Sequence, residues 1–324
     1  MSPEISPPRL SVVIVVRNGA DTIARALDSL ATQYYPNLEL VIWDGLSEDG
    51  TLDILKQYSH LITLLKSEKD SGPPDAYNKA VALCSGDFIG FLNADDEYEP
   101  GALWAVADKI FKYPESEVVS FGMLYYRAHA GNYSSIKGYY ADERQLALTL
   151  DHILLENQTF MLSRFYRRAL LAEAGPFNTD RSLWYYSNDR EFMARLAVRG
   201  CKNTIIPKAL YGFAIHEESL SNNPVNYSSI VEEHTRIAAM LLARKELNTH
   251  QRTAIINWRK RQLVFGFWQA LASRKFYTAQ LFIKRGLTLA SWQFIPLSFY
   301  LLARKMLKRI GLALSGGIDR GTIL

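Results

Sequence analysis

Short hydrophobic runs alternate with amphipathic segments along residues 10–112. Residues 10–16 (LSVVIVV) form a continuous run rich in β-branched side chains, which is typical of a strand buried on both faces of a sheet. The same signals predict three more strands, at residues 38–43, 62–65 and 88–92, and four helices, after Asp21, from Thr51, and over residues 75–83 and 100–112. We expect Asp21 to cap the first helix. This alternation predicts an α/β domain with a mainly parallel sheet.

Acidic side chains follow these strands at the points where the strands end. Asp44 ends the second strand, Glu68 and Asp70 follow the third, and Asp95 and Asp96 follow the fourth. In open α/β sheets, ligands bind at the carboxyl ends of the strands. Neither the dinucleotide fingerprint G-x-G-x-x-G nor the phosphate-loop pattern G-x-x-x-x-G-K-[ST] is present, which argues against a dehydrogenase or a phosphate-loop ATPase.

The adjacent carboxylates Asp95 and Asp96 are costly to hold together. Like charges at this spacing raise each other's pKa unless a cation or hydrogen bonds compensate. A divalent metal bound by carboxylate oxygens and by substrate phosphates would compensate. The alternative is a solvated turn that ends the strand.

Composition places the chain among large globular proteins. It has 324 residues, of which 48% are hydrophobic and 22% charged, enough for one large domain with an appendage. Its two cysteines, Cys84 and Cys201, have no ligand spacing, which argues against a disulfide scaffold or a zinc site and fits a reducing cytosol. No secretory signal is visible at the N-terminus.

Charge is distributed unevenly along the chain. Residues 228–324 contain 16 Lys and Arg against 4 Asp and Glu, whereas residues 1–227 contain 21 against 29. We therefore predict two parts, residues 1–227 and 228–324, with different roles. The second part is helical in pattern, basic and rich in aromatic residues, which favours a helical region lying at a membrane surface. A helical cap, an oligomer contact and a nucleic-acid patch are the alternatives, and no nucleic-acid motif is present.

Two long segments resemble a known enzyme family. Residues 11–51 (SVVIVVRNGADTIARALDSLATQYYPNLELVIWDGLSEDGT) and 67–98 (SEKDSGPPDAYNKAVALCSGDFIGFLNADDEY) are similar to inverting glycosyltransferases of family 2, especially their polysaccharide-assembly members. The resemblance covers roughly residues 9–220. It implies a GT-A fold, a Rossmann-like sheet with flanking helices. It also implies transfer of a sugar from a nucleotide-diphosphate donor, expected to be a UDP-sugar, to a hydroxyl of a growing lipid-linked cell-surface polysaccharide. The enzyme would lie peripherally at the inner face of the cytoplasmic membrane.

The resemblance assigns the nucleotide site to three acidic positions. Asp44 would contact the base, although it could instead only form a strand-end turn. Asp75 would bind the nucleotide, with Asn78 and Lys79 lining the same pocket, although Lys79 could be a solvated helix charge. Asp70 would touch the base or the sugar. Ser47, Asp49, Gly50 and Thr51 match a family element for which we expect a structural role, as a turn and helix cap.

The resemblance also implies a metal site and a catalytic base. Asp95 and Asp96 match the DxD element, in which Asp95 would bind the ribose or help the metal, and Asp96 would ligate Mn²⁺ or Mg²⁺. His216 would reach the metal or the diphosphate. Asp189, in NDREFMARL at residues 188–196, would be the base, with Glu191 as the fallback. Asp189 could also be a helix N-cap.

Two positions depart from the family pattern. Asn157 stands where many relatives have His, while its neighbour Gln158 could still bind the donor sugar. Asn188 replaces an acidic or small residue before the base. These departures keep open a second hypothesis, a catalytically inactive nucleotide-sugar-binding scaffold in a membrane glycan-assembly complex. A nucleotidyltransferase is a third possibility, disfavoured because no glycine-rich N-terminal phosphate loop is present. The turn at residues 174–178 (AGPFN) is expected to position the base helix.

Overall fold

The computed structural model describes residues 6–129, 132–140, 143–155, 161–180, 186–215 and 227–290. The chain divides into two compact units, Met1–His216 and Glu217–Leu324. Each unit is described on its own. The boundary predicted at residue 227 stays a prediction, because residues 216–226 lie outside the described part of the chain.

The first unit is built on a mixed sheet whose strand order is β3-β2-β1-β4-β8-β6-β9-β5, with β7 paired to β6. The strands β1 to β4 run parallel, β6 runs parallel to β9, and the remaining pairs are antiparallel. The strands are β1 (Leu10–Val16), β2 (Leu38–Asp44), β3 (Leu64–Ser67), β4 (Phe88–Phe91), β5 (Glu97–Tyr98), β6 (Val118–His129), β7 (Asn132–Tyr140), β8 (Arg164–Arg167) and β9 (Asn203–Ile215).

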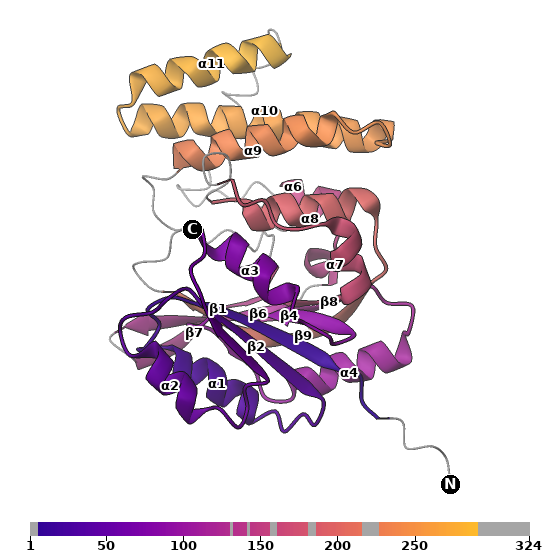
Figure 1. The fold of residues 1–324 in the computed structure, drawn as a ribbon. Helices are drawn as coiled ribbons and strands as arrows, with labels where there is room; N and C mark the ends of the chain where they lie inside the picture. Colours follow the sequence, from indigo (N-terminus) through magenta and orange to yellow (C-terminus); the bar gives the residue numbers. More distant parts are fainter. Residues whose placement is uncertain are drawn as a thin grey trace. The chain divides into compact units, whose positions relative to one another are not determined.

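Helices cover both faces of this sheet, with α1, α2 and α4 on one face and α3, α7 and α8 on the other (Figure 1). The helices of this unit are α1 (Ile23–Ala31), α2 (Thr51–Gln57), α3 (Pro73–Val81), α4 (Ala102–Lys112), α5 (Glu143–Leu146), α6 (Leu150–Leu155), α7 (Arg168–Ala174) and α8 (Asn188–Arg199). The predicted α/β class is therefore confirmed. The mainly parallel arrangement holds for the first four strands, while the later strands make the sheet mixed.

Each face of the sheet has its own apolar core. On the α1 and α4 face, the buried side chains include Leu10, Ile14 and Val106. On the α3 and α8 face, aromatic rings predominate, and the ring centroids of Phe177 and Phe192 lie 4.5 Å apart. Burial on both faces explains why the first strands read as continuous hydrophobic runs rather than alternating ones.

Two expected helix starts differ from the structure. The helix expected at residues 75–83 begins at Pro73, because proline at the first two helical positions loses no intrahelical hydrogen bond and has a helical φ. The cap expected from Asp21 is wrong: α1 begins at Ile23 after Thr22, and no side chain caps it.

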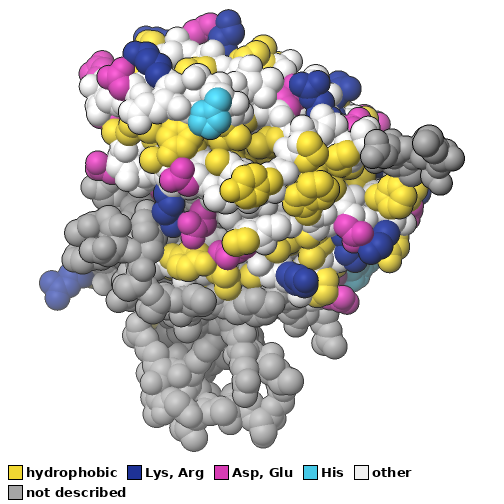
Figure 2. Space-filling model, turned by 90° about the horizontal axis from the view of Figure 1, so that it is seen from below, with side chains coloured by type: hydrophobic (Ala, Val, Ile, Leu, Met, Phe, Trp, Pro, Cys, Tyr) yellow, Lys and Arg dark blue, Asp and Glu magenta, His cyan; other side chains and the backbone are white. Residues whose placement is uncertain are grey.

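The face formed by α1, α2 and α4 exposes scattered hydrophobic side chains among charged ones (Figure 2). Trp104 on α4 is 45% exposed, yet its indole Nε1 donates to the backbone oxygen of Gln33 at 3.0 Å. Its ring packs edge-on against Tyr35 at a centroid distance of 5.1 Å. Trp104 therefore fastens α4 to the end of α1 rather than standing free at the surface.

The buried carboxylate of Glu39, near the amino end of β2, joins three segments of the chain. Glu39 on β2 is 4% exposed and accepts hydrogen bonds from Ser11 Oγ, Arg9 Nη2, Ser85 N and Oγ, and Gly86 N. Burial raises the pKa of Glu39, but the hydrogen bonds from Ser11, Ser85 and Gly86 outweigh it, and the net shift is downward. The ionised carboxylate thereby stabilises the turn that leads into β4.

The second unit contains three helices among its described residues: α9 (Tyr227–Leu242), α10 (Thr249–Ala272) and α11 (Phe276–Ala290). A capping box starts α10, in which the side chains of Asn248 and Gln251 each bond the other's backbone N–H. The absence of a side chain at Gly266 lets α10 approach its neighbours, because a Cβ there would lie 2.8 Å from Val231 and 2.9 Å from Phe282. No helix within residues 227–290 combines the length and apolarity that a membrane crossing requires.

We predict that Glu39→Gln lowers the free energy of unfolding by about 2–3 kcal/mol at pH 7, because buried donors lose a charged acceptor. The pKa of Glu39 is lower in the folded state, so its stabilisation is present above the unfolded pKa of about 4.3 and disappears as pH falls through the folded value. Urea denaturation across pH 7 to 3 measures both effects. Glu48→Gln, at an exposed position, is the matched control, and an equal loss in both variants would contradict the prediction.

Candidate active site

The strand register brings the candidate residues to one edge of the sheet. Val16 pairs with Asp44, and Asp44 pairs with Ser67, so β1, β2 and β3 end level with one another. The strand β4 runs parallel to β1, so residues 93–96 follow it at the same edge. The predicted ligand edge is therefore formed as in other open α/β sheets.

Asp44 is fully buried at this edge. Its carboxylate accepts hydrogen bonds from Ser47 N, at 3.1 and 3.3 Å to its two oxygens, and from Ser67 Oγ at 2.6 Å. These bonds hold the carboxylate fixed between the ends of β2 and β3. Because each carboxylate oxygen has two lone pairs, Asp44 keeps capacity to accept a further donor such as an imide N–H.

The loop after β2 is hydrogen-bonded to the loop after β1. Asn18 N donates to Ser47 Oγ at 2.8 Å, and Gly19 N donates to Thr51 Oγ1 at 2.9 Å. Asp49 accepts from Ala20 N at 2.9 Å and from Thr51 N at 3.1 Å. The predicted turn is confirmed, since these polar side chains join two loops. The predicted helix cap is wrong, because the N-cap of α2 is Gly50 and no side chain caps it.

Asp75, in the first turn of α3, is held by the loop before it. Its carboxylate accepts from Ser71 N at 2.9 Å and pairs with Lys79 Nζ at 3.1 Å. Burial raises the pKa of Asp75, but the bonds from Ser71 and Lys79 outweigh it and lower the pKa overall. Lys79 Nζ also donates to the backbone oxygen of Lys69 and lies 5.2 Å from the ring centroid of Trp43. Lys79 is therefore an anchored residue rather than a solvated charge.

Asp70 lies against the start of the loop that follows Asp44. A Cβ on Gly45 would come within 2.7 Å of Asp70 Oδ2, so the missing side chain at Gly45 makes room for this carboxylate. Asp70 Oδ1 accepts from Gly72 N at 2.8 Å. Asp44 and Asp70 therefore lie at neighbouring positions of one edge.

Asn78 bridges α3 to the turn before α8. Its amide Nδ2 donates to Phe177 O, and its Oδ1 accepts from Phe177 N, both at 2.8 Å. From the other side, Arg195 Nη2 donates to Pro176 O at 2.8 Å. The positioning role predicted for residues 174–178 is confirmed by these contacts. A nucleotide contact by Asn78 stays a prediction.

Asp96 is buried at the tip of β4, with 1% of its surface exposed. Its Oδ2 accepts from Tyr211 Oη at 2.7 Å and from Asn93 Nδ2 at 2.9 Å, and its Oδ1 accepts from Ala214 N at 2.8 Å. Burial, followed by the charge of Asp95, raises the pKa of Asp96 to about 8 despite these bonds. Asp96 thus ties the tip of β4 to β9, and its charge still lacks full compensation.

Tyr77 on α3 is bonded to the turn that carries the candidate carboxylates Asp95 and Asp96. Its hydroxyl donates to Asn93 Oδ1 at 3.0 Å. Burial raises the pKa of this hydroxyl well above its usual value, and the charges of Asp96, Asp95 and Asp189 raise it further. The Tyr77 hydroxyl thus helps to hold Asn93, which itself donates to Asp96.

Asp189 is the second residue of α8, and its Oδ1 accepts from Arg190 N at 2.7 Å. The helix N-cap is Ser187, so the reading of Asp189 as an N-cap is wrong. A carboxylate in the first turn of a helix is stabilised in its ionised form by the helix dipole. Asp189 is partly exposed, as a group that meets substrate must be.

Glu191, the fallback base, has a different environment. It is 2% exposed, and its Oε1 lies 2.7 Å from Arg195 Nε. The same arginine holds the turn at Pro176. Glu191 is therefore buried in an ion pair with the arginine that holds this turn, which argues against Glu191 as the base.

Two predicted site residues, Gln158 and His216, lie outside the described residues, so their contacts with sugar, metal or diphosphate stay predictions. Within the described part of the chain, no group of three or more His, Cys, Asp or Glu side chains could hold a metal ion. The adjacent carboxylates of Asp95 and Asp96 fit a hard cation chemically, since Mg²⁺ and Mn²⁺ accept one or two carboxylates plus substrate phosphates. Burial is the main cause of the raised pKa of Asp96, and the neighbouring charge of Asp95 adds to it.

Comparison with known sequences places this site in a family. A sequence profile described as "Glycosyl transferase family 2" matches residues 11–173, about half of the chain. The chain belongs to glycosyl transferase family 2. The matched residues include Asp44, Asp75, Asp95 and Asp96, and they end before Asp189.

A curated relative covers part of the chain. The PGL/p-HBAD biosynthesis glycosyltransferase Rv2957 of Mycobacterium tuberculosis is 32% identical over 178 residues, which are 54% of this chain and 65% of that protein. The match thus covers less than two thirds of that relative.

Solved structures extend the likeness to almost the whole chain. The crystal structure of S. aureus TarS 1-349 in complex with UDP-GlcNAc has a TM-score of 0.68 and 19% identity, covering 97% of this chain and 95% of that one. The mannosyltransferase PcManGT from Pyrobaculum calidifontis, in complex with GDP-Man and Mn²⁺, has a TM-score of 0.59 and 18% identity, covering 95% and 86%. At this identity the likeness shows the fold, which confirms the predicted GT-A class.

Two tyrosines of this family 2 site were not predicted from the sequence. Tyr211 lies on β9, 115 residues after the carboxylate it contacts, and no local pattern indicates such a pairing. Tyr77 lies two residues after Asp75, in a helix already predicted to line the site. Its position on α3 could therefore have indicated a role in the site. Both hydroxyls act on the Asn93–Asp96 turn rather than on a strand end.

We predict that Tyr211→Phe lowers the free energy of unfolding by about 1–2 kcal/mol, because Asp96 loses one of three donors in a buried setting. Tyr58→Phe is the matched control, since the Tyr58 hydroxyl donates to Asp28 at 2.8 Å on the exposed surface, where such a bond contributes little. Urea denaturation of both variants measures the difference. Equal losses would contradict the role of Tyr211 in holding the β4 tip.

Proposed function

We propose that this protein is an inverting, metal-dependent glycosyltransferase that moves a sugar from a nucleotide-diphosphate donor to a hydroxyl of a growing, lipid-linked cell-surface glycan. The observation that carries this proposal is the strand register, which brings Asp44 and the turn containing Asp95 and Asp96 to one edge of the sheet in a chain of glycosyl transferase family 2. A carboxylate pair suited to a cation therefore lies at the edge where such sheets bind ligands. Family membership and the UDP-GlcNAc complex of TarS support a nucleotide-sugar donor.

Asp189 is the proposed base. The acceptor oxygen attacks the anomeric carbon while the bond from that carbon to the diphosphate oxygen breaks, and the hydroxyl proton passes to Asp189. The electron pair of the broken bond leaves with the nucleotide diphosphate. Because attack occurs opposite the leaving group, the anomeric carbon is inverted without a covalent enzyme intermediate. The position of Asp189 in the first turn of α8 favours the ionised form that a base requires.

The carboxylates of the β4 tip would have separate tasks. Both oxygens of Asp96 already accept bonds from Asn93, Tyr211 and Ala214, whereas Asp95 is partly exposed. These contacts favour Asp95 as the main metal ligand, and Asp96 as the group that positions the turn and adds negative charge. The bound cation would neutralise the diphosphate leaving group. The Mn²⁺ complex of PcManGT supports this requirement.

The nucleotide would bind at the carboxyl ends of strands β2 and β3. Asp44 is the proposed acceptor for the base, supported by its fixed position and remaining lone pairs. Asp75 and Lys79 form an ion pair beside it, and we propose that Lys79 turns toward a phosphate when the donor binds. The second unit, with its excess of basic residues, is proposed to lie on the anionic membrane surface that carries the acceptor.

We predict that Asp189→Asn lowers sugar transfer at least 100-fold, because the isosteric amide cannot take the acceptor proton. The assay measures UDP, GDP and dTDP release over a panel of donors with Mn²⁺ or Mg²⁺, and EDTA should abolish the signal. Asp108→Asn, on the surface of α4 and paired only with Lys112 among the described residues, is the control. Calorimetry with UDP and Mn²⁺ tests donor binding in each variant.

Full activity in Asp189→Asn would remove Asp189 from the base role. Donor binding by the wild-type protein without any release across the panel would instead support the catalytically inactive scaffold.

We also predict that the full chain floats with vesicles containing phosphatidylglycerol and not with phosphatidylcholine alone, because basic residues are drawn to anionic lipid. A version ending at residue 227 should remain at the bottom of the gradient. If both versions float equally, or neither floats, the assignment of residues 228–324 to the membrane surface fails.

A further inference from the structure

The helical second unit contains a cavity of about 210 Å³ between α9, α10 and α11. Its lining includes three arginines, Arg236, Arg259 and Arg285, one carboxylate, Glu232, and the apolar side chains of Ala239 and Leu263. We call this cavity the arginine pocket. Its volume is roughly seven times the ~30 Å³ share of a water molecule, which is room for a group of several heavy atoms.

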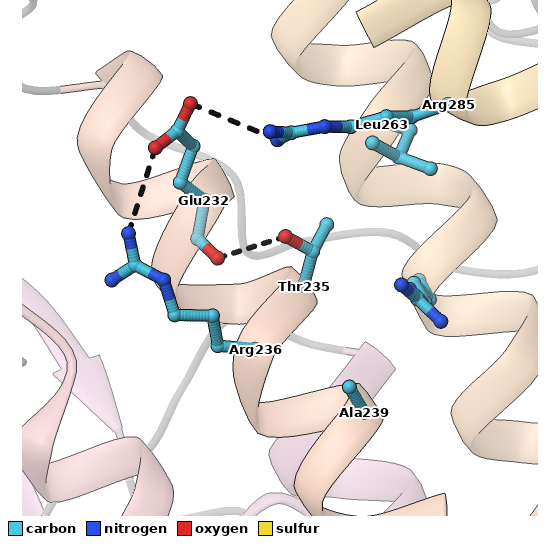
Figure 3. Close-up of a pocket in the computed structure, with 7 residues that line it drawn as sticks. Glu232, Thr235, Arg236, Ala239, Leu263 and Arg285 are labelled. Carbon is cyan, nitrogen blue, oxygen red and sulfur yellow. Dashed lines mark hydrogen bonds and ion pairs between the residues drawn. The ribbon is translucent and has the colours of Figure 1, made fainter. Parts of the chain in front are cut away.

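Glu232 does not neutralise the arginine pocket. Its carboxylate is shared between Arg236 at 3.6 Å and Arg285 at 3.7 Å, and both distances exceed the 2.7–2.9 Å typical of a charge-assisted hydrogen bond. Figure 3 shows Glu232 lying between these two guanidinium groups. One carboxylate against three guanidinium groups leaves the lining with a net charge of about +2.

Arg259 is the group whose charge is least compensated. Its Nε is buried and has no hydrogen-bond partner among the described residues. Burial lowers the pKa of Arg259, and the neighbouring charge of Arg285 lowers it further. The guanidinium of Arg259 is therefore partly desolvated and repelled by its neighbour, and an anion in the pocket would offset both effects.

Packing among α9, α10 and α11 holds these three arginines close to one another. The α10 helix packs closely on its neighbours at Gly266, and the apolar cluster of Val231, Leu263 and Phe282 holds the three helices. The guanidinium groups are therefore presented from a packed frame, one from each helix, rather than from a loop.

We propose that the arginine pocket binds a phosphate group with a charge near −2, such as a phosphate monoester or one phosphate of a diphosphate. Arginine forks match the oxygens of a phosphate, and a dianion would balance the net charge of the lining. A carboxylate would supply half of that charge. This site lies in a different unit from Asp44, Asp95 and Asp189, and it does not depend on the proposed transfer reaction.

The test is a titration of the full-length protein with inorganic phosphate, followed by ³¹P NMR without divalent metal, so that a metal-dependent donor site does not contribute. The wild-type protein should bind phosphate. Arg259→Gln and Arg285→Gln should each weaken binding about tenfold or more, because a charge-assisted bond is lost. Glu232→Gln should strengthen binding by removing the competing carboxylate. Lys275→Gln, which removes the same charge at an exposed position outside the pocket, should bind as the wild type does.

Circular dichroism establishes folding, and the partly exposed Arg285 provides a usable variant if Arg259→Gln does not fold. Absence of phosphate binding in the wild type, wild-type affinity in folded Arg285→Gln, or an equal loss in Lys275→Gln would overturn the proposal. Flotation with vesicles containing phosphatidic acid, whose headgroup is a phosphate monoester, distinguishes the sources of the phosphate. Weaker flotation of Arg285→Gln identifies a lipid headgroup, and unchanged flotation alongside weaker phosphate binding identifies a soluble phosphate.

Discussion

The buried carboxylate of Asp96 is the constraint around which the first unit is organised. A carboxylate with 1% exposure at a strand tip survives only with donors around it, and these come from Asn93 in its own turn and from Tyr211 and Ala214 on β9. The two contacts with β9 span 115 and 118 residues of sequence. They fix the turn after β4 in one conformation, and Asp95 is carried in that turn. The position of the partly exposed Asp95 therefore depends on the hydrogen bonds that hold the buried Asp96.

The opposite wall of the site depends on aromatic packing rather than on charge. Phe177 packs against Phe192 on α8, and its backbone is bonded in both directions to Asn78 on α3. Arg195 holds the same turn and is itself paired with Glu191. These contacts fix the start of α8, and with it Asp189, relative to Tyr77. The predicted base is therefore positioned by groups that have no part in the chemistry.

The strands β1, β2 and β4 and the helices between them could be predicted from sequence because burial on both faces leaves an unbroken hydrophobic run, and the helices show periodic apolar spacing. The long pairing of β6 with β7 and β9 could not be predicted from sequence. Bulges interrupt the register of both pairs, and β9, the parallel partner of β6, comes from a distant segment of the chain. Asp44, Asp75 and Asp95 could be predicted as site residues because local motifs contain them. The roles of Tyr211 and of the donors to Glu39 could not be predicted, because their contacts exist only once the sheet has formed. The Glu191–Arg195 pair has the i, i+4 spacing of a helix ion pair, so the weakness of Glu191 as a base could have been anticipated.

The two units offer phosphate groups opposite electrostatic environments. At the β4 tip, the proposed function places a divalent cation between the carboxyl groups of Asp95 and Asp96 and the diphosphate, so phosphate binding there would depend on metal. In the arginine pocket, three guanidinium groups stand against the single carboxylate of Glu232, so the excess charge of the lining is already positive. The proposed phosphate binding there would need no cation. Under the two proposals, the acidic part of the chain before residue 228 would recognise phosphate through a metal ion, and the basic part after it would do so through guanidinium groups.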